Sequence, residues 1–319
     1  FGKELGFIFG FKYGSAVRYD PNGISQRVGD ESLGFPFDRK DNAKISRETN
    51  SISALLNIAY KLNKNNKVSF LFMPNVIGNN DVASYEEMHM GISYQEANVM
   101  RNIFYEQRKQ MVYQYSSQHY IPSIKMKLDV NASYTDGKSV APDFKATQYM
   151  QVLNFDSIVS YQFSPSAGDG IRRYYRNLDE NIFDGRIGAE IPLKTSKEGA
   201  VRKIKFGAAT QRNYRKIDND EYRLFSGNNI NVSPLTDGNL DNYLSPDKFV
   251  LQNGVVDYYY KHFDFDRNHS FGHSNVEAAY ALLDYEINSS LRFSGGVRAE
   301  HTDIFTDVDK YSRLGYGYN

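Results

Sequence analysis

The sequence contains no cysteine and no tryptophan. Without cysteine the chain has neither disulfide bonds nor thiolate metal ligands, and a cysteine nucleophile is excluded as well. Its 38 basic and 38 acidic residues cancel, so the charge does not indicate nucleic-acid binding.

The chain also lacks long hydrophobic runs: none approaches the ~18 apolar residues of a membrane-spanning helix. Its mean hydropathy of −0.58 is that of a polar chain. A membrane protein built of strands remains compatible with both, because a barrel strand needs about ten residues with one apolar face only. The sequence begins with Phe1 and shows no signal-peptide pattern, so we expect a mature, trimmed or partial chain.

The main pattern in the sequence is an alternation of apolar and polar side chains. Residues 124–134, IKMKLDVNASY, alternate apolar and polar side chains without a break. The same two-residue period recurs in 4–19, 51–62, 67–73, 182–193, 201–213 and 291–302, and less regularly in 104–119 and 276–287. A two-residue period predicts β-strands. The sequence therefore predicts an all-β chain of about nine strands without amphipathic helices.

The predicted connections alternate in length. Long polar connections fall at 20–44, 78–100, 136–170 and 218–272, and short ones at 63–66, around Pro122, at 194–199 and at 288–290. Outer-membrane barrels combine short periplasmic turns with long outer loops, whereas a soluble β-sandwich rarely needs loops this long. A soluble β-sandwich or β-rich repeat is the alternative. We expect one antiparallel transmembrane barrel domain over 1–319, with its apolar face toward lipid and its polar face toward a wet lumen.

Tyrosines fit this arrangement. Tyr60 and Tyr285 are predicted on the lipid side near the short turns, and Tyr13 and Tyr134 on the lipid side near the long loops. Two such levels correspond to the aromatic girdles of outer-membrane barrels.

Two long segments each have the pattern of a hairpin: LLNIAYKLNKNNKVSFLF (55–72) and AYALLDYEINSSLRFSGGVRAEHT (279–302). The first resembles one hairpin, and the second a late hairpin, of the barrel domain of TonB-dependent outer-membrane receptors of the Bacteroidetes type. Between them lie further similar segments: 113–144, with Pro142-Asp143 where the family often places this pair, 174–193 and 204–225. Five pieces in family order cover nearly the whole chain.

The resemblance implies a bacterial outer-membrane location and energised uptake of a nutrient such as a siderophore, glycan or peptide. The partners it implies are TonB, a plug domain of the same protein and outer-membrane lipid, with a surface lipoprotein or larger outer-membrane complex as a further partner. We expect the plug and the TonB-contacting segment to lie outside this chain. About nine strands are too few for a 22-stranded transporter barrel, so we expect part of a larger barrel.

Charged residues gather on the predicted lumen side near the short turns. We interpret them as a charged belt that contacts whatever fills the lumen, the plug in the resembled family. Seven are basic and four acidic: Lys61, Lys67, Lys125, Lys127, Lys203, Lys205, Arg292, Asp129, Glu190, Asp284 and Glu286. A water-filled, low-dielectric barrel focuses such a field, so we expect acidic groups on the filler.

Ligand contacts are expected in the long connections, where arginine and tyrosine cluster. The candidates are Arg172, Arg173, Tyr174, Tyr175, Tyr258, Tyr259 and Tyr260. Histidines and aspartates gather in 261–274, KHFDFDRNHSFGHS, but their spacing matches no standard metal site. No GxSxG or comparable catalytic set is present. We therefore expect no catalytic residues, no cofactor and no metal, and a protein that is not an enzyme.

Two other functions fit the same pattern. A barrel that no longer transports can serve as a structural or docking component of a larger outer-membrane assembly, and a passive porin has a similar wall. An intact plug and TonB-contacting segment would favour transport over the scaffold, and an open pore in conductance measurements would favour the porin.

Overall fold

Nearly every described residue lies in a β-strand. The computed structural model describes residues 3–30, 35–89, 96–154, 157–162, 171–193, 202–226, 244–252, 254, 256–263, 265, 268–288 and 290–308. The strands are β1 (Glu4–Asp30), β2 (Phe35–Asn63), β3 (Asn66–His89), β4 (Glu96–Ile121), β5 (Met126–Asn154), β6 (Ser157–Gln162), β7 (Arg172–Pro192), β8 (Arg202–Ser226), β9 (Tyr258–Phe263), β10 (His269–Asn288) and β11 (Leu291–Val308). A short 3-10 helix, η1 (Pro246–Phe249), precedes β9.

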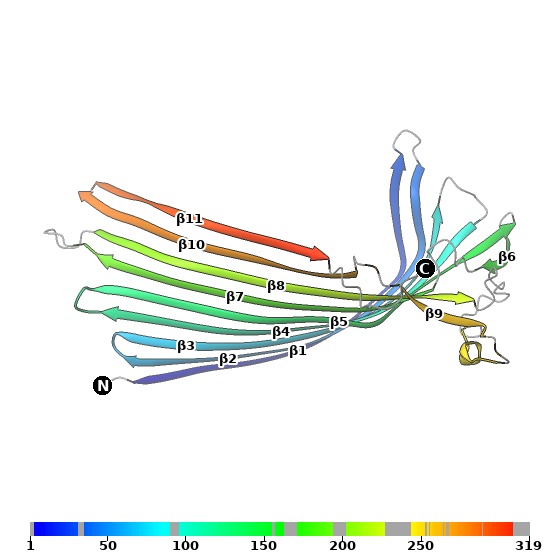
Figure 1. Cartoon of the computed structure of the whole chain (residues 1–319), viewed down its shortest axis with the longest axis horizontal. Helices are drawn as coiled ribbons and strands as arrows, with labels where there is room; N and C mark the ends of the chain where they lie inside the picture. The colour runs from blue at the N-terminus through cyan, green and yellow to red at the C-terminus, as the bar shows by residue number, and fades with distance from the viewer. Residues whose placement is uncertain are drawn as a thin grey trace.

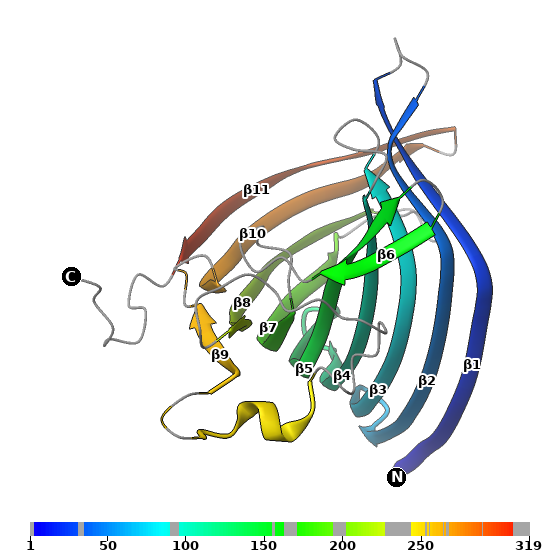
Figure 2. The same ribbon diagram turned by 90° about the vertical axis from the view of Figure 1, so that its right-hand side faces the viewer.

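All of these strands form one antiparallel sheet. Nine long strands follow in the order β1-β2-β3-β4-β5-β7-β8-β10-β11, while β6 pairs with β5 and β9 with β8. Figure 1 shows the long strands side by side, and Figure 2 shows that the wall they form is curved. Among the described strands β1 and β11 each have one neighbour. The sheet is therefore open and does not close into a barrel.

The alternating segments correspond to the nine long strands. Each segment that the two-residue period predicts lies within one of them, apart from one or two residues at some ends. The segment 124–134, for example, enters β5 only at Met126, and Lys125 lies in the preceding turn with a φ of 54°. The prediction of an all-β chain of antiparallel hairpins is confirmed. Among the described residues, no helix is long and apolar enough to cross a membrane.

The lengths assigned to the long connections are wrong. Residues 20–30, 35–44, 78–89, 96–100, 136–154 and 218–226 continue the neighbouring strands instead of forming loops. Polar residues interrupt the two-residue hydrophobic period in these extensions, but backbone pairing continues through them. Cross-strand ion pairs accompany it, such as Arg47 with Asp81 at 2.7 Å and Arg215 with Glu180 at 2.6 Å.

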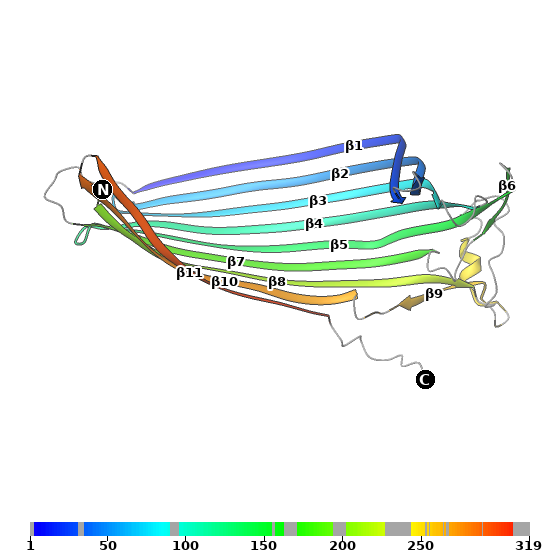
Figure 3. The same cartoon turned by 90° about the horizontal axis from the view of Figure 1, so that it is seen from above.

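The two ends of the sheet differ. Figures 1 and 3 show the hairpins β2–β3, β4–β5 and β10–β11 turning at one end, which we call the turn end, while β6, β9 and η1 lie at the other, the extended end. At the turn end β2 stops at Asn63 and β3 starts at Asn66. The predicted short connection 194–199 lies outside the described residues.

Pairing keeps apolar and polar side chains on separate faces. Phe7 pairs with Ile58, Ile58 with Phe70, Phe70 with Tyr115 and Tyr115 with Ala132, which makes one apolar row across five strands. An adjacent row is polar and contains Ser69, Ser116, Asn131 and Arg186. Since side chains alternate along each strand, we call the two sides the apolar face and the polar face.

The apolar face carries large exposed side chains. Leu5 is 68% exposed, Phe7 75%, Phe9 66% and Phe11 65%. In the described part of the chain no large side chain is fully buried, so no second layer of secondary structure packs on this face. Hydrophobic side chains of this size are stabilised only when an apolar medium or partner covers them.

One close contact on the polar face requires glycine. Gly188, Gly207 and Tyr280 form a cross-strand row on β7, β8 and β10. A Cβ at Gly207 would lie 2.5 Å from the carbonyl oxygen of Ile187 and 2.7 Å from the ring of Tyr280. The tyrosine ring therefore lies directly on the glycine backbone, a packing that only a missing side chain permits.

We expect Gly207→Ala to destabilise the sheet by roughly 1–3 kcal/mol, because backbone or ring must shift to admit the methyl group. Thermal unfolding followed by circular dichroism measures this loss. Gly6→Ala on β1 is the matched control, since a Cβ there would meet nothing within 4 Å. Equal melting of the two variants would contradict the close contact.

Candidate functional site

The charged belt of the sequence analysis lies largely on one face. The register places ten of its eleven residues on the polar face at the turn end: Lys61, Lys67, Lys127, Asp129, Glu190, Lys203, Lys205, Asp284, Glu286 and Arg292. Lys125 differs, because its backbone belongs to the turn before β5. The belt crosses the sheet from β2 to β11.

On β7 to β11 the belt is internally paired. Glu190 accepts a hydrogen bond from Lys203 at 3.0 Å and forms an ion pair with Lys205 at 3.4 Å. Arg292 binds Asp284 through two nitrogens, at 2.6 Å and 2.5 Å. Glu190 and Asp284 are thus compensated within the wall, which leaves this half of the belt with little need for an outside counter-ion.

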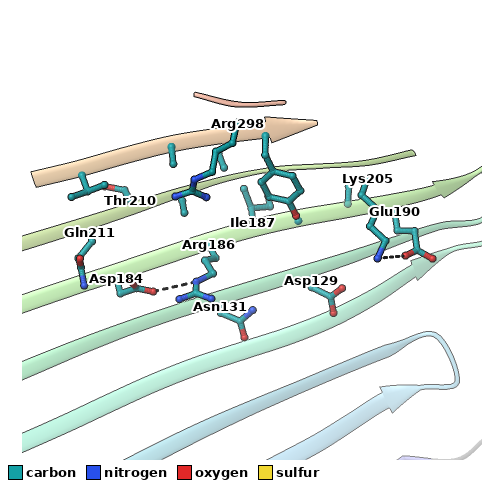
Figure 4. Close-up of a pocket in the computed structure, with 17 residues that line it drawn as sticks. Asp129, Asn131, Asp184, Arg186, Ile187, Glu190, Lys205, Thr210, Gln211 and Arg298 are labelled. Atoms are coloured by element: carbon teal, nitrogen blue, oxygen red, sulfur yellow. Dashed lines mark ion pairs between the residues drawn. The ribbon is translucent and has the colours of Figure 1, made fainter. Parts of the chain in front are cut away.

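A hollow of about 600 Å³ lies on the polar face beside this paired half. Figure 4 shows Arg186, Arg298 and Lys205 lining it, with Asp184 facing Arg186. The Arg186–Asp184 distance is 3.7 Å, longer than a direct hydrogen bond. This part of the polar face is hydrophilic and charged.

The arginine–tyrosine run on β7 is divided between two faces. The register places Arg172 and Tyr174 on the polar face, opposite Arg223 and Glu221 of β8. Arg173 and Tyr175 point to the opposite side, opposite Tyr222 and Asp220. On β9, Tyr259 pairs with Phe225 of the polar-face series, whereas Tyr258 and Tyr260 pair with residues of the other series. The seven candidates therefore do not form one site.

Arg173 has a structural role. It binds Asp143 through two nitrogens at 2.5 Å and 2.6 Å, and its guanidinium lies 5.4 Å from the ring centre of Tyr260. Tyr260 packs in turn against a small buried cluster of Val99, Tyr149 and Ile171. These contacts join β4, β5, β7 and β9 at the extended end.

Burial raises the pKa of Asp143, but the hydrogen bonds and charge of Arg173, together with Lys145, outweigh it and hold that pKa below its ordinary value. Asp143 has a φ of 67° at an irregularity in β5 between Ala141 and Phe144. Aspartate and asparagine tolerate this left-handed backbone better than most residues.

The polar face at the extended end carries a ladder of rings. Phe104 of β4 contacts Phe144 of β5 edge to face at 5.1 Å, and Phe144 stacks on Tyr174 of β7 at 5.5 Å. The guanidinium of Arg176 lies 5.1 Å from the ring centre of Phe144 and 5.0 Å from that of Tyr174. Arg172 donates a hydrogen bond to the Tyr174 hydroxyl at 3.3 Å.

The ladder continues on β8 and β9. Arg223 pairs directly across from Arg172 and lies 4.5 Å from the ring centre of Phe263. Phe263 also stacks with Phe225, which stacks with Tyr259. We call this set the aromatic–arginine surface; its members are Phe104, Phe144, Arg172, Tyr174, Arg176, Arg223, Phe225, Tyr259 and Phe263.

Flat rings next to guanidinium groups bind ligands that combine a flat or ring-shaped apolar face with an anionic or hydrogen-bonding group. Six members of this surface were not among the sequence candidates: Phe104, Phe144, Arg176, Arg223, Phe225 and Phe263. The alternation of Arg172, Tyr174 and Arg176 with Arg173 and Tyr175 is visible in the sequence. The face that all nine members share follows from the strand register.

The histidines of 261–274 have individual carboxylate partners. His262 lies 3.2 Å from Asp220, His269 3.1 Å from Asp218, and His273 of β10 2.9 Å from Asp303 of β11. Asp264 and Asp266 lie outside the described residues. Within the described part of the chain, no three His, Asp or Glu side chains are grouped closely enough to hold a metal ion.

No family model, curated protein or solved structure matched this chain.

The pair of Arg173 and Asp143 gives a stability prediction with a defined pH dependence. We expect Asp143→Asn to destabilise the protein by about 1–2 kcal/mol near neutral pH, because it removes a charge-assisted pair and keeps the tolerated backbone. The folded pKa of Asp143 is depressed, so this contribution is complete above the ordinary carboxyl pKa of about 3.9 and disappears as the pH falls through the folded pKa.

Unfolding curves between pH 2 and pH 8 measure the difference. Asp179→Asn is the matched control, because Asp179 pairs with Lys138 at 3.6 Å with both side chains about half exposed, which predicts an effect within about 0.5 kcal/mol. A loss for Asp143→Asn that stays constant down to pH 2 would contradict the assignment.

Proposed function

We propose that this chain forms part of the β-barrel of a TonB-dependent receptor in the bacterial outer membrane and that the receptor takes up a nutrient with energy from TonB. The observation that carries the membrane part is a continuous apolar band across the nine long strands. The receptor family itself rests on the sequence resemblance.

The band has the height of a membrane. On β2 it runs from Ile52 to Leu62, about 34 Å along the strand at ~3.4 Å per residue. A strand tilt of about 40° reduces this to roughly 26 Å, close to the apolar band of outer-membrane barrels. Beyond Ile52 the same face becomes polar at Asn50 and Glu48, although the strand continues. At the Ile52 edge the limit of the band is therefore set by side chains, not by the end of the strand.

Tyrosines lie at the edge of the band that faces the extended end of the sheet. The hydroxyl of Tyr13 donates a hydrogen bond to Asn50 at 3.3 Å, and that of Tyr134 donates to Asn181 at 2.6 Å. Their rings belong to the apolar rows, and their hydroxyls bond the first polar residues beyond this edge of the band. This is the position in which amphipathic rings suit a membrane–water interface.

On this proposal the polar face lines the lumen. The aromatic–arginine surface then lies at the end of the lumen that opens to the outside of the cell. A ligand arriving from outside would meet these rings and guanidinium groups first. The barrel performs no covalent reaction, and the family resemblance assigns the energised step to a plug and TonB.

Uptake tests the function. A strain lacking the natural full-length protein is compared with its complemented parent on a panel of iron chelates, glycans, peptides and cobalamins. We expect one class of compound to be lost, and its uptake to stop when a protonophore removes the energy source. Normal uptake of every class by the deletion strain would favour the scaffold, and uptake that a protonophore does not affect would favour the porin.

Membrane contact gives a residue-level prediction. The chain contains no cysteine, so single cysteines can carry a fluorophore at chosen sites. In lipid vesicles we expect brominated lipid to quench fluorophores at Ile58→Cys and Val130→Cys several-fold more than at their neighbours Asn57→Cys and Asn131→Cys. Equal quenching at neighbouring positions would show that the apolar face packs on protein rather than lipid.

Ligand contact gives a second prediction, from neighbouring residues on opposite faces. We expect Tyr174→Ala to weaken uptake of the identified nutrient at low concentration about tenfold or more, because it removes a ring that stacks on Phe144 and contacts Arg176. Tyr175→Ala, on the other face, should leave uptake within about twofold when protein levels are matched. Equal losses in both variants would contradict a polar-face ligand site.

A further inference from the structure

A second hollow on the polar face, of about 530 Å³, lies at the turn end on β2 to β5. Four lysines line it: Lys61, Lys64, Lys67 and Lys127. Asp129 is the one carboxylate among its described lining residues, so four positive charges minus one negative leave a local charge of +3. We call it the lysine hollow.

Its charges are incompletely compensated within the wall. Lys127 lies opposite Glu190 in the register of β5 and β7, but Glu190 is already paired with Lys203 and Lys205. Lys61 lies directly opposite Lys67 in the register of β2 and β3, and like charges in that position repel. Lys61 has a partner in Glu4 at 3.4 Å. Among the described residues, no carboxylate lies within ion-pair distance of Lys67 or Lys127. This contrasts with the other half of the belt, where Glu190 and Asp284 are paired.

We propose that the lysine hollow binds an acidic polypeptide segment. The lysines extend from β2 to β5, three strand spacings or roughly 15 Å. A single phosphate ion is much smaller than this width and would contact only some of the lysines. An extended peptide places carboxylates on one side every second residue, about 7 Å apart, and so reaches lysines on separate strands.

The remaining lining suits a peptide as well. Gln118 lies between Lys67 and Asp129 in the cross-strand row, where its amide can bond a peptide backbone. His119 and Asn66 are already bonded to each other at 2.7 Å and hold the adjacent rim in place. Charge supplies the attraction, and the amide supplies recognition of the main chain.

Carbodiimide cross-linking tests the occupant, because it joins lysine amines to carboxylates in contact. The natural full-length protein is treated in its native membrane fraction, digested and analysed by mass spectrometry. We expect Lys67 and Lys127 to be linked to aspartate or glutamate of a peptide from outside the hollow. The link between Lys203 and Glu190 is the internal control, since these groups lie 3.0 Å apart.

Matched variants check that the lysines attract this segment. In Lys67→Gln/Lys127→Gln we expect the links from the remaining Lys61 and Lys64 to that peptide to fall about tenfold. Lys138→Gln on the opposite face should leave them unchanged. Links confined to Asp129 or Glu4, or no links while the control forms, would overturn the proposal.

Inorganic phosphate is the competing occupant. Saturable binding of phosphate at low millimolar concentration, lost in the double variant and accompanied by no peptide link, would show an anion site and also overturn the proposal. The inference concerns the polar face alone. A peptide link without nutrient uptake would leave it standing while the transport function fails, and uptake without a link would do the reverse.

Discussion

Backbone pairing between neighbouring strands keeps every row of side chains on a fixed side of this sheet, and the other properties of the molecule depend on it. Nine long strands hold their register over most of their length. Because of this, the two-residue period of each strand adds up to two continuous surfaces. One carries Phe7, Ile58 and Phe70, and the other carries the belt and the aromatic–arginine surface. No second layer among the described residues is needed to define them.

The sequence was sufficient for the strands with one apolar face, such as 4–19 and 124–134, because hydrophobic alternation is a local property. It was insufficient beyond the apolar band. Residues around Glu48 or Lys138 are polar on both faces, so the period disappears although pairing continues. Composition then predicts a loop, whereas the structure has strands joined by backbone bonds and ion pairs.

The candidate residues divide in the same way. Membership of the belt follows from alternation within single strands, so position on one face could be predicted for all but Lys125. Which charges compensate one another could not, because the partners of Glu190 and Asp284 come from the register between strands. The aromatic–arginine surface depends further on the irregularity between Ala141 and Phe144, which aligns Phe144 with Tyr174. No local sequence pattern predicts this shift in register.

Side chains of the two faces alternate along β7, and this alternation determines which mutations the strand can accept during evolution. Arg172, Tyr174 and Arg176 belong to one surface, and Arg173 and Tyr175 to the other, at successive positions in the chain. Substitutions can therefore alter ligand contacts without disturbing the pair of Arg173 and Asp143. A single-residue insertion in the paired strand has the opposite effect, since it exchanges the two sets and every row beyond them. Variation in this region should accordingly proceed by replacement, and changes in length should come in twos or be absorbed at a bulge.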